Sequence, residues 1–161
     1  MFDKKLLNDI AATLTKTNRT LAVAESVTSG LLQAAFSNAD GASFFYQGGI
    51  TAYNIGQKCR HLLIEPLHAL ECNCVSEKIA QQLSKNVCGM FVSDYGIGIT
   101  GYAATIPEKD INELFSYYSI CFNNEIIESG MIKTNVQQGF PAQLYFTTTL
   151  LQKFKNCLEE K

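Results

Sequence analysis

The sequence lacks three features that would place it in a broad class: a surplus of basic residues, a long apolar run and a secretory N-terminus. Its 13 lysines and arginines are matched by 15 aspartates and glutamates, and the net charge is -2. Because nucleic-acid binders usually carry a basic patch, we expect no nucleic-acid partner. The apolar stretches fall short of the ~18 residues that a transmembrane helix needs, so we expect no membrane contact. Residues 1–5 begin a polar-interrupted pattern instead of a signal peptide, and we expect a cytoplasmic protein.

The Cys-x2-Cys spacing that is typical of zinc sites is also missing, although the chain has six cysteines. Cys72 and Cys74 are separated by one residue, with His61 and His68 nearby, and no second pair follows at zinc-finger distance. We therefore expect no metal and no cofactor, and reduced thiols that serve as small core or surface residues. The cysteines are Cys59, Cys72, Cys74, Cys88, Cys121 and Cys157.

Apolar periodicity is what the sequence does offer, and it predicts an α/β fold. The chain of 161 residues, 47% of them hydrophobic, fits one compact domain over 1–161. Helical spacing covers 2–16, 31–36, 55–63, 77–88 and 143–158, and strand patterns cover 20–24, 44–53, 95–101, 115–122 and 125–133. Pro66 is expected to end the third helical segment. Because strands and helices interleave, we predict a layered α/β fold with a partly parallel sheet and an antiparallel hairpin edge across Asn123–Asn124.

Two groups of glycines lie within strand patterns. The stretch from Gly96 to Gly101 matches G-x-G-x-x-G by letter, but its alternating apolar residues put it inside a strand, and no helix pattern follows. Close packing of the strand explains these glycines better than a dinucleotide site. Gly48 and Gly49 similarly indicate a bulge or a close backbone approach in their strand.

The turn after the first strand is the most informative segment. Ser26 lies between a buried strand and a helix that is expected to begin near Thr28, so its hydroxyl should lie beside free backbone N–H groups. Such groups stabilise a phosphate or a developing oxyanion. The alternative is that Ser26, Thr28 and Ser29 only cap the helix. The segment is neither a Walker loop nor a G-x-S-x-G elbow, because Ala24 occupies the first glycine position.

A serine nucleophile needs a base, and lysine is a better candidate than histidine here. His61 and His68 fall in a helix-and-loop region where surface positions are expected. Lys58 follows the end of the second strand, in the same carboxyl-end layer as Ser26. It can accept a proton only if desolvation lowers its pKa. Tyr53, at that strand end, could hydrogen-bond the lysine amine or the serine hydroxyl. The alternative for Lys58 is an ordinary, solvated lysine on a helix.

At this point the residues resemble a known family. Residues 24–30 are similar to the A-E-S-C-T-G-G signature of the nicotinamide-nucleotide amidases, the CinA C-terminal domain family. Residues 45–53 resemble the F-x-x-G-x-V-x-Y strand of that family, and Lys58 falls at the lysine of Y-S-N-x-x-K. Residues 74–77 and 98–101 resemble G-A-V-S-E and S-x-T-G.

The resemblance implies a three-layer α/β/α single domain that hydrolyses the carboxamide of nicotinamide mononucleotide. Ser26 would be the nucleophile, Lys58 the general base and later acid, and Tyr53 the group that orients the pair. The partner would be a small nucleotide substrate, without metal or cofactor, and the resemblance implies a homo-oligomer. The substrate-binding positions would be Glu25, Thr28, Ser29, Gly30, Thr100 and Gly101, with N–H groups of 28–30 as an anion cradle.

The chain also departs from the family pattern. Ser29 replaces a signature glycine, Val27 replaces the cysteine, and the G-I-A-G-P-G-G-G loop is replaced by residues 101–106. Two rival hypotheses therefore stay open: a non-catalytic binding or regulatory member, and an amidase for another small amide. Larger CinA proteins carry an added N-terminal domain, for which we expect no room in 161 residues.

Overall fold

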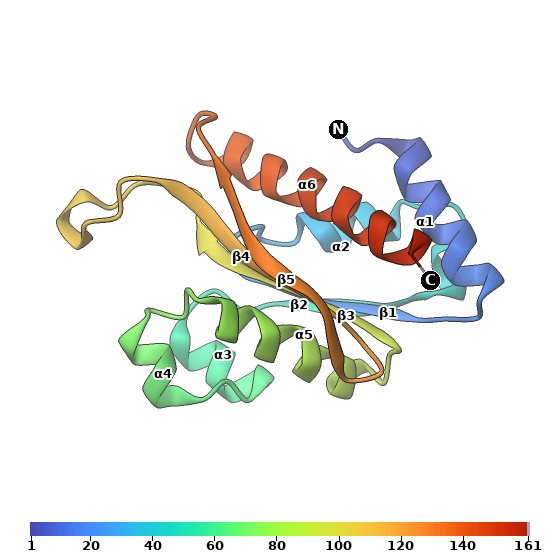
Figure 1. Cartoon of the computed structure of the whole chain (residues 1–161), viewed down its shortest axis with the longest axis horizontal. Helices are drawn as coiled ribbons and strands as arrows, with labels where there is room; N and C mark the ends of the chain where they lie inside the picture. The colour runs from blue at the N-terminus through green and yellow to red at the C-terminus, as the bar shows by residue number, and fades with distance from the viewer. Residues whose placement is uncertain (161) are drawn as a thin grey trace.

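The computed structural model describes residues 1–160, which form a sheet between helices (Figure 1). The elements in chain order are α1 (Lys4–Lys16), β1 (Leu21–Glu25), α2 (Leu31–Ser37), η1 (Ala42–Phe44), β2 (Tyr46–Thr51), α3 (Ile55–Leu62), α4 (Pro66–Glu71), α5 (Glu77–Phe91), β3 (Tyr95–Tyr102), η2 (Pro107–Lys109), β4 (Leu114–Phe122), β5 (Glu125–Thr134) and α6 (Phe140–Glu159).

The five-stranded sheet has the order β2-β1-β3-β4-β5. β1 pairs in parallel with both β2 and β3, whereas β3–β4 and β4–β5 are antiparallel. The prediction of a partly parallel sheet with a hairpin edge is therefore confirmed. Since β1, β2 and β3 run the same way, their carboxyl ends meet at one edge, which is where an open α/β sheet usually binds its ligand.

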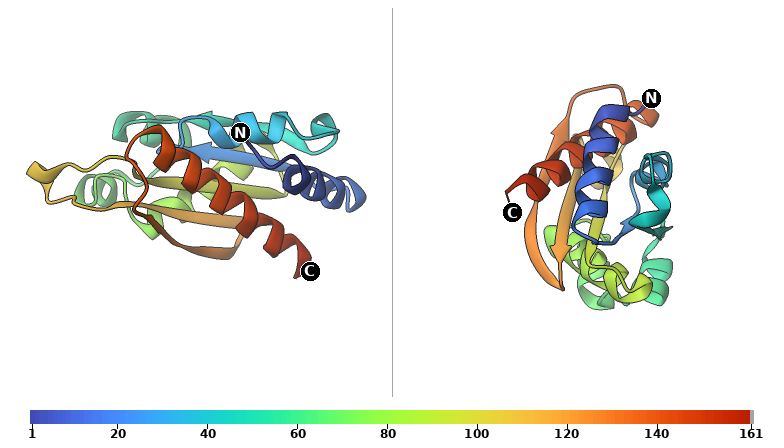
Figure 2. Two further views of the ribbon diagram at one scale, coloured as in Figure 1. Left: turned by 90° about the horizontal axis from the view of Figure 1, so that it is seen from above. Right: turned by 90° about the vertical axis from the view of Figure 1, so that its right-hand side faces the viewer.

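Helices cover both faces of the sheet, which gives the three layers that the family resemblance implied. In Figure 1 α1, α2 and α6 lie on one face and α3, α4 and α5 on the other, and the right-hand view of Figure 2 shows the same separation. A separate apolar cluster fills each side. The larger one contains Phe36 of α2 and Phe146 and Phe154 of α6, and the smaller one contains Ile79 and Leu83 of α5.

Glycines bring α5 against β3. A Cβ at Gly98 would lie 2.5 Å from the Ala80 carbonyl oxygen, and one at Gly96 would lie even closer to that of Ser84. The glycines therefore serve the close approach of strand and helix, as predicted for the G-x-G-x-x-G stretch. Ser76 caps the start of α5, because its Oγ accepts a hydrogen bond from the N–H of Ile79 at 3.2 Å.

The predicted turn and bulge are both present. Asn123 and Asn124 have φ angles of 49° and 67°, the left-handed conformation that a tight β4–β5 turn requires. The register of β1 against β2 shifts between Leu21 and Ala22, and Gly48 next to this bulge has a φ of 131°. A residue other than glycine would be strained there.

Several predicted boundaries were wrong. Pro66 does not end a helical segment: it occupies the first turn of α4, where its missing N–H costs no hydrogen bond. β2 is shorter than 44–53 because residues 42–44 form a 3-10 turn. α2 begins at Leu31, not near Thr28, because Ser29 and Gly30 adopt positive φ angles of 51° and 98°.

Two further sequence expectations concern membranes and thiols. Within residues 1–160, no helix has both the length and the hydrophobicity to cross a membrane. All six cysteines are free: four are buried, and Cys59 and Cys72 are half-buried.

Candidate functional site

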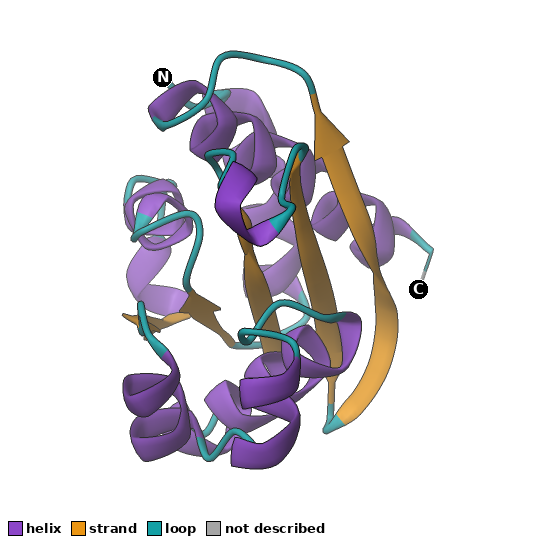
Figure 3. Ribbon diagram, turned by 90° about the vertical axis from the view of Figure 1, so that its left-hand side faces the viewer, coloured by secondary structure: helices purple, strands orange, loops and turns teal. Residues whose placement is uncertain are grey.

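A cavity of about 720 Å³ lies at the carboxyl ends of the parallel strands. We call it the carboxyl-end cavity. Figure 3 views the molecule from the end at which the loop between β3 and β4 projects. Six of the nine predicted site residues line this cavity, from three neighbouring strand ends: Ser26, Ser29, Tyr53, Lys58, Thr100 and Gly101. Residues far apart in the sequence are thus brought to one place, as the strand-end argument expected.

Ser26 directly follows β1 and is 6% exposed. Its carbonyl accepts a hydrogen bond from the N–H of Ser29 at 3.1 Å, which closes a tight turn. From α6, the Nε2 of Gln143 donates to the Val27 carbonyl at 2.9 Å. These contacts fix the backbone on both sides of the turn, so Ser26 is held at the cavity wall.

Glu25 points away from the cavity and caps α2. Its carboxylate is 1% exposed and accepts hydrogen bonds from the N–H groups of Leu32 at 2.8 Å and Gln33 at 3.0 Å. The hydroxyl of Thr28 donates to the same carboxylate at 2.6 Å. Neither Glu25 nor Thr28 lines the cavity, so their side chains stabilise the Ser26 turn instead of contacting a ligand there.

The predicted anion cradle is only partly available. The Ser29 N–H is already bonded to the Ser26 carbonyl. At the start of α2, the N–H groups of Leu32 and Gln33 are bonded to the Glu25 carboxylate. Within residues 1–160, the N–H groups of Thr28 and Gly30 have no protein acceptor. Gly30 itself does not line the cavity, and its φ of 98° makes it the turn residue before α2.

Lys58, in α3, is 4% exposed although it carries an amine. No ion pair joins it to a carboxylate among residues 1–160. Burial lowers its pKa below the ordinary 10.5, an effect that the nearby thiols of Cys74, Cys72 and Cys59 partly offset. Burial also raises the pKa of the Cys74 thiol, which keeps it neutral. Lys58 is therefore not the solvated helix lysine of the alternative reading, and a neutral amine can accept a proton.

Tyr53 borders the mouth of the cavity and is 80% exposed. In the described part of the chain, no hydrogen bond links its hydroxyl to Ser26 or Lys58. The structure therefore does not contain the hydrogen bond that the sequence suggested for this side chain.

Thr100 and Gly101 line the cavity at the end of β3, and each also has a role in holding the fold together. The buried hydroxyl of Thr100 donates to the Cys74 carbonyl at 2.6 Å, which ties β3 to the loop before α5. A Cβ at Gly101 would collide with the Phe115 carbonyl oxygen of β4.

Sequence reasoning missed several residues that line the cavity, among them the polar residues Asn73, Tyr102, Lys109 and Gln143. Asn73 donates a hydrogen bond to the Tyr102 hydroxyl at 3.1 Å and has a φ of 51°. Lys109 is an exposed cation on the loop that replaces the glycine-rich family loop. No local signal marks Gln143, because it reaches the site only through the packing of α6.

Comparison with known proteins agrees with the fold and the strand-end motifs. The model of the CinA C-terminal domain matches residues 3–114. The chain belongs to the CinA C-terminal domain family. Two relatives, named as competence-damage inducible proteins from Natranaerobius thermophilus and Streptococcus pneumoniae, are each 36% identical to this CinA-family chain. The matches cover 66% and 63% of this chain but 26% and 24% of the relatives, so it spans about a quarter of their length.

Solved structures extend the likeness to nearly the whole chain. A CinA superfamily protein from Klebsiella pneumoniae has a TM-score of 0.91 at 21% identity, with 98% of both chains covered. A competence or damage-inducible protein from Enterobacter asburiae has a TM-score of 0.90 at 20% identity and covers 98% of this chain and 99% of its own. At this identity the likeness concerns the CinA-type fold alone.

Proposed function

We propose that this CinA-family chain is an amidohydrolase that converts nicotinamide mononucleotide to nicotinic acid mononucleotide and ammonia. One observation carries the proposal: Lys58, nearly buried and without a carboxylate partner, borders the same cavity as Ser26. A nucleophilic serine needs a neighbouring base that is neutral near physiological pH. Burial lowers the pKa of Lys58, which favours the neutral amine more than in a solvated lysine.

The proposed reaction has two halves. Lys58 accepts the hydroxyl proton as Ser26 Oγ attacks the carboxamide carbon, and the negative charge develops on the carbonyl oxygen. Lys58 then returns the proton to the departing nitrogen, which leaves as ammonia and gives an acyl ester on Ser26. Water, deprotonated by Lys58, attacks this ester, and Lys58 returns that proton to Ser26 Oγ as the carboxylic acid leaves. The N–H groups of residues 28–30 do not supply the oxyanion donors in this arrangement, because Thr28 and Gly30 do not line the cavity and the Ser29 N–H is bonded to the Ser26 carbonyl.

The rest of the cavity suits a mononucleotide. Its volume of about 720 Å³ is in the ordinary range for small-molecule sites. Lys109 offers one cation to a phosphate group, and the exposed Tyr53 ring offers a flat surface at the mouth. A chain with net charge -2 can hold one phosphate in this way without a basic surface.

The altered loop favours a second candidate. Residues 101–106 lack the glycine-rich sequence, and the Ala103 carbonyl accepts from the N–H of Gly139 at 2.7 Å, which ties the loop to the start of α6. The same cavity could therefore serve a non-catalytic member that binds a nucleotide, or an amidase that acts on a different small amide.

Ammonia release and calorimetry separate these candidates. The proposed enzyme releases ammonia from nicotinamide mononucleotide, and its rate rises with pH as Lys58 becomes neutral. The Lys58→Arg variant keeps the positive charge but cannot act as a base, so it should be inactive while still binding the nucleotide. Nucleotide binding without ammonia release by the unaltered chain would support the binding module. Ammonia release from another small amide alone would support the third candidate.

A further inference from the structure

Two buried thiols outside the carboxyl-end cavity lie against each other. Cys88 of α5 and Cys121 of β4 have their Sγ atoms 3.1 Å apart. Gly96 of β3 makes room for them, because a Cβ there would lie 2.5 Å from Cys88 Sγ and 3.1 Å from Cys121 Sγ. The first glycine of the G-x-G-x-x-G stretch thus accommodates a sulfur pair as well as the α5 backbone. Within residues 1–160, no other two cysteine sulfurs are in contact.

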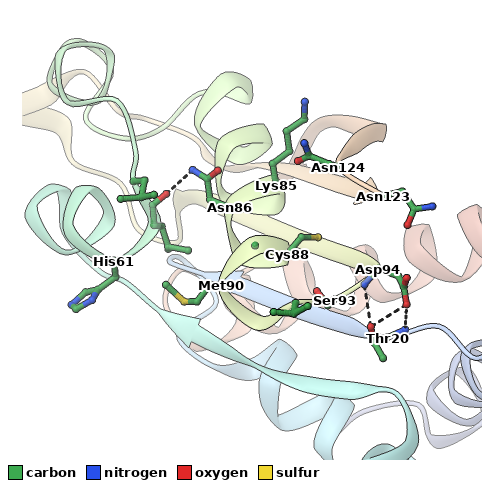
Figure 4. Close-up of a pocket in the computed structure, with 14 residues that line it drawn as sticks. Thr20, His61, Lys85, Asn86, Cys88, Met90, Ser93, Asp94, Asn123 and Asn124 are labelled. Atoms are coloured by element: carbon green, nitrogen blue, oxygen red, sulfur yellow. Dashed lines mark hydrogen bonds between the residues drawn. The ribbon is translucent and has the colours of Figure 1, made fainter.

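Of the two cysteines, Cys88 lines a cavity and Cys121 does not line it. Cys88 lines a second cavity of about 880 Å³, which we call the amino-end cavity because it lies at the amino ends of β1 and β3. Figure 4 shows Cys88 there with Thr20, Lys85, Asp94, Asn123 and Asn124 around it. Cys88 is 8% exposed, whereas Cys121 is fully buried. A small reagent that enters this cavity therefore meets Cys88 first.

The hydrogen bonds give the two thiols different acidity. The single S–H of Cys121 is within reach of both Cys88 Sγ and the Ser84 carbonyl oxygen, each at 3.1 Å. This hydrogen bond lowers the pKa of Cys88 against the effect of burial, and a further one with Ser93 acts in the same direction. The pKa of Cys121 is raised by its hydrogen bond to Cys88 and by burial. The accessible thiol is therefore the one that favours the nucleophilic thiolate.

We propose that Cys88 and Cys121 are a redox-active dithiol, in which Cys88 reacts with a small hydroperoxide and Cys121 then closes a disulfide. The Cys88 thiolate attacks one peroxide oxygen, the O–O bond breaks, and sulfenic acid and hydroxide (or an alkoxide) form. The Cys121 sulfur then attacks the Cys88 sulfur and displaces its oxygen as water. In sum, the two thiols lose two protons and two electrons, and hydrogen peroxide becomes two waters. The new bond would join α5 directly to β4.

The test uses the full chain, freshly reduced and then treated with hydrogen peroxide. Free thiols are alkylated, and the protein is digested with trypsin without reduction. Cleavage after Lys85, Lys109 and Lys133 places Cys88 in peptide 86–109 and Cys121 in peptide 110–133, each with no other cysteine. We expect these two peptides to be linked, with the mass of two hydrogens lost, and to separate when a reductant is added.

Three variants sharpen the result. Cys121→Ser should stop at the sulfenic acid, which dimedone captures on Cys88, and Cys88→Ser should leave Cys121 unmodified. Cys157→Ser is the matched control, because Cys157 is 6% exposed but hydrogen-bonds Glu128 instead of a thiol, and the 86–109/110–133 link should still form. The proposal is wrong if peroxide oxidises Cys59 or Cys72 while these two peptides stay unlinked. It is equally wrong if Cys121 is oxidised in the Cys88→Ser variant.

Discussion

The carboxylate of Glu25 lies 2.6 Å from the hydroxyl of Thr28, on the side of the Ser26 turn that faces away from the cavity. The same carboxylate accepts the N–H groups of Leu32 and Gln33. One buried acid thus holds the turn that follows β1 and the helix that follows the turn. The position of Ser26 depends on this network, although none of its side chains reaches the cavity.

Replacing Glu25 with glutamine should therefore destabilise the protein. Glutamine keeps the shape but loses the charge that strengthens hydrogen bonds, and its NH₂ group faces donors. We expect a loss of about 1.5–3 kcal/mol in the free energy of unfolding, measured by urea denaturation. Glu125→Gln, at an exposed position, is the control and should change stability by less than about 0.5 kcal/mol. Equal stability of the two variants would contradict the capping role.

Two glycines, Gly98 in the α5–β3 contact and Gly89 on the exposed side of α5, give predictions of opposite sign. Gly98→Ala places a Cβ 2.5 Å from the Ala80 carbonyl oxygen and should destabilise by about 1–3 kcal/mol or more. Gly89→Ala, in α5 with nothing within 4 Å of the new carbon, should stabilise by about 0.5–1 kcal/mol. Thermal unfolding of both variants checks this, and a stable Gly98→Ala protein would mean that α5 lies farther from β3.

The lowered pKa of Lys58 predicts how its contribution to stability changes with pH. Between the folded pKa and the ordinary 10.5, the unfolded chain holds a proton at this lysine that the folded chain does not. The free energy of unfolding therefore rises with pH through that window, and the cost of burying the charge is full below it. Lys58→Met should stabilise the protein near neutral pH, and its advantage should disappear above pH 10.5.

Urea denaturation of this variant at neutral and alkaline pH is the measurement. Lys16→Met, on the exposed side of α1, is the control and should show little dependence of this kind. If Lys58→Met is less stable than the unaltered chain at neutral pH, Lys58 has a partner that holds its charge.

Lys109 should act on the phosphate end of the substrate. Lys109→Gln removes the cation from the cavity rim, and we expect KM for nicotinamide mononucleotide to rise about threefold to tenfold with kcat nearly unchanged. The comparison with nicotinamide riboside, which lacks the phosphate, decides the point. The same rise in KM for both compounds would show that Lys109 does not contact the phosphate.

The sequence predicted the parts of the site that depend on local order. Ser26 and Lys58 each follow a strand, and parallel neighbours bring such positions to one edge, so their meeting in one cavity was accessible without coordinates. Asn123–Asn124 was likewise a local signal, because these side chains tolerate positive φ.

What the sequence could not predict depends on contacts between distant segments or on a delayed helix start. The family resemblance implied that Glu25 binds substrate, but its carboxylate caps α2. This cap depends on the helix starting at Leu31, after the positive φ angles of Ser29 and Gly30, and the sequence predicted an earlier start. Gln143 comes from α6, and nothing near it in the sequence indicates the hydrogen bond to Val27. A proline can follow the end of one helix or occupy the first turn of the next. For Pro66, the capping carboxylate of Glu65 indicates the start of a helix.

The central claim is that Ser26 attacks a carboxamide in this cavity, and the most direct test is ammonia release from nicotinamide mononucleotide by three proteins. Ser37→Ala is the matched control, because Ser37 is exposed on α2 and its hydroxyl bonds only the Ala34 carbonyl. We predict that the unaltered chain and Ser37→Ala release ammonia at the same rate. Ser26→Ala should lose at least ~1,000-fold in rate, as expected for removal of a nucleophile. Ammonia release that persists in Ser26→Ala at the rate of the unaltered chain would contradict the account.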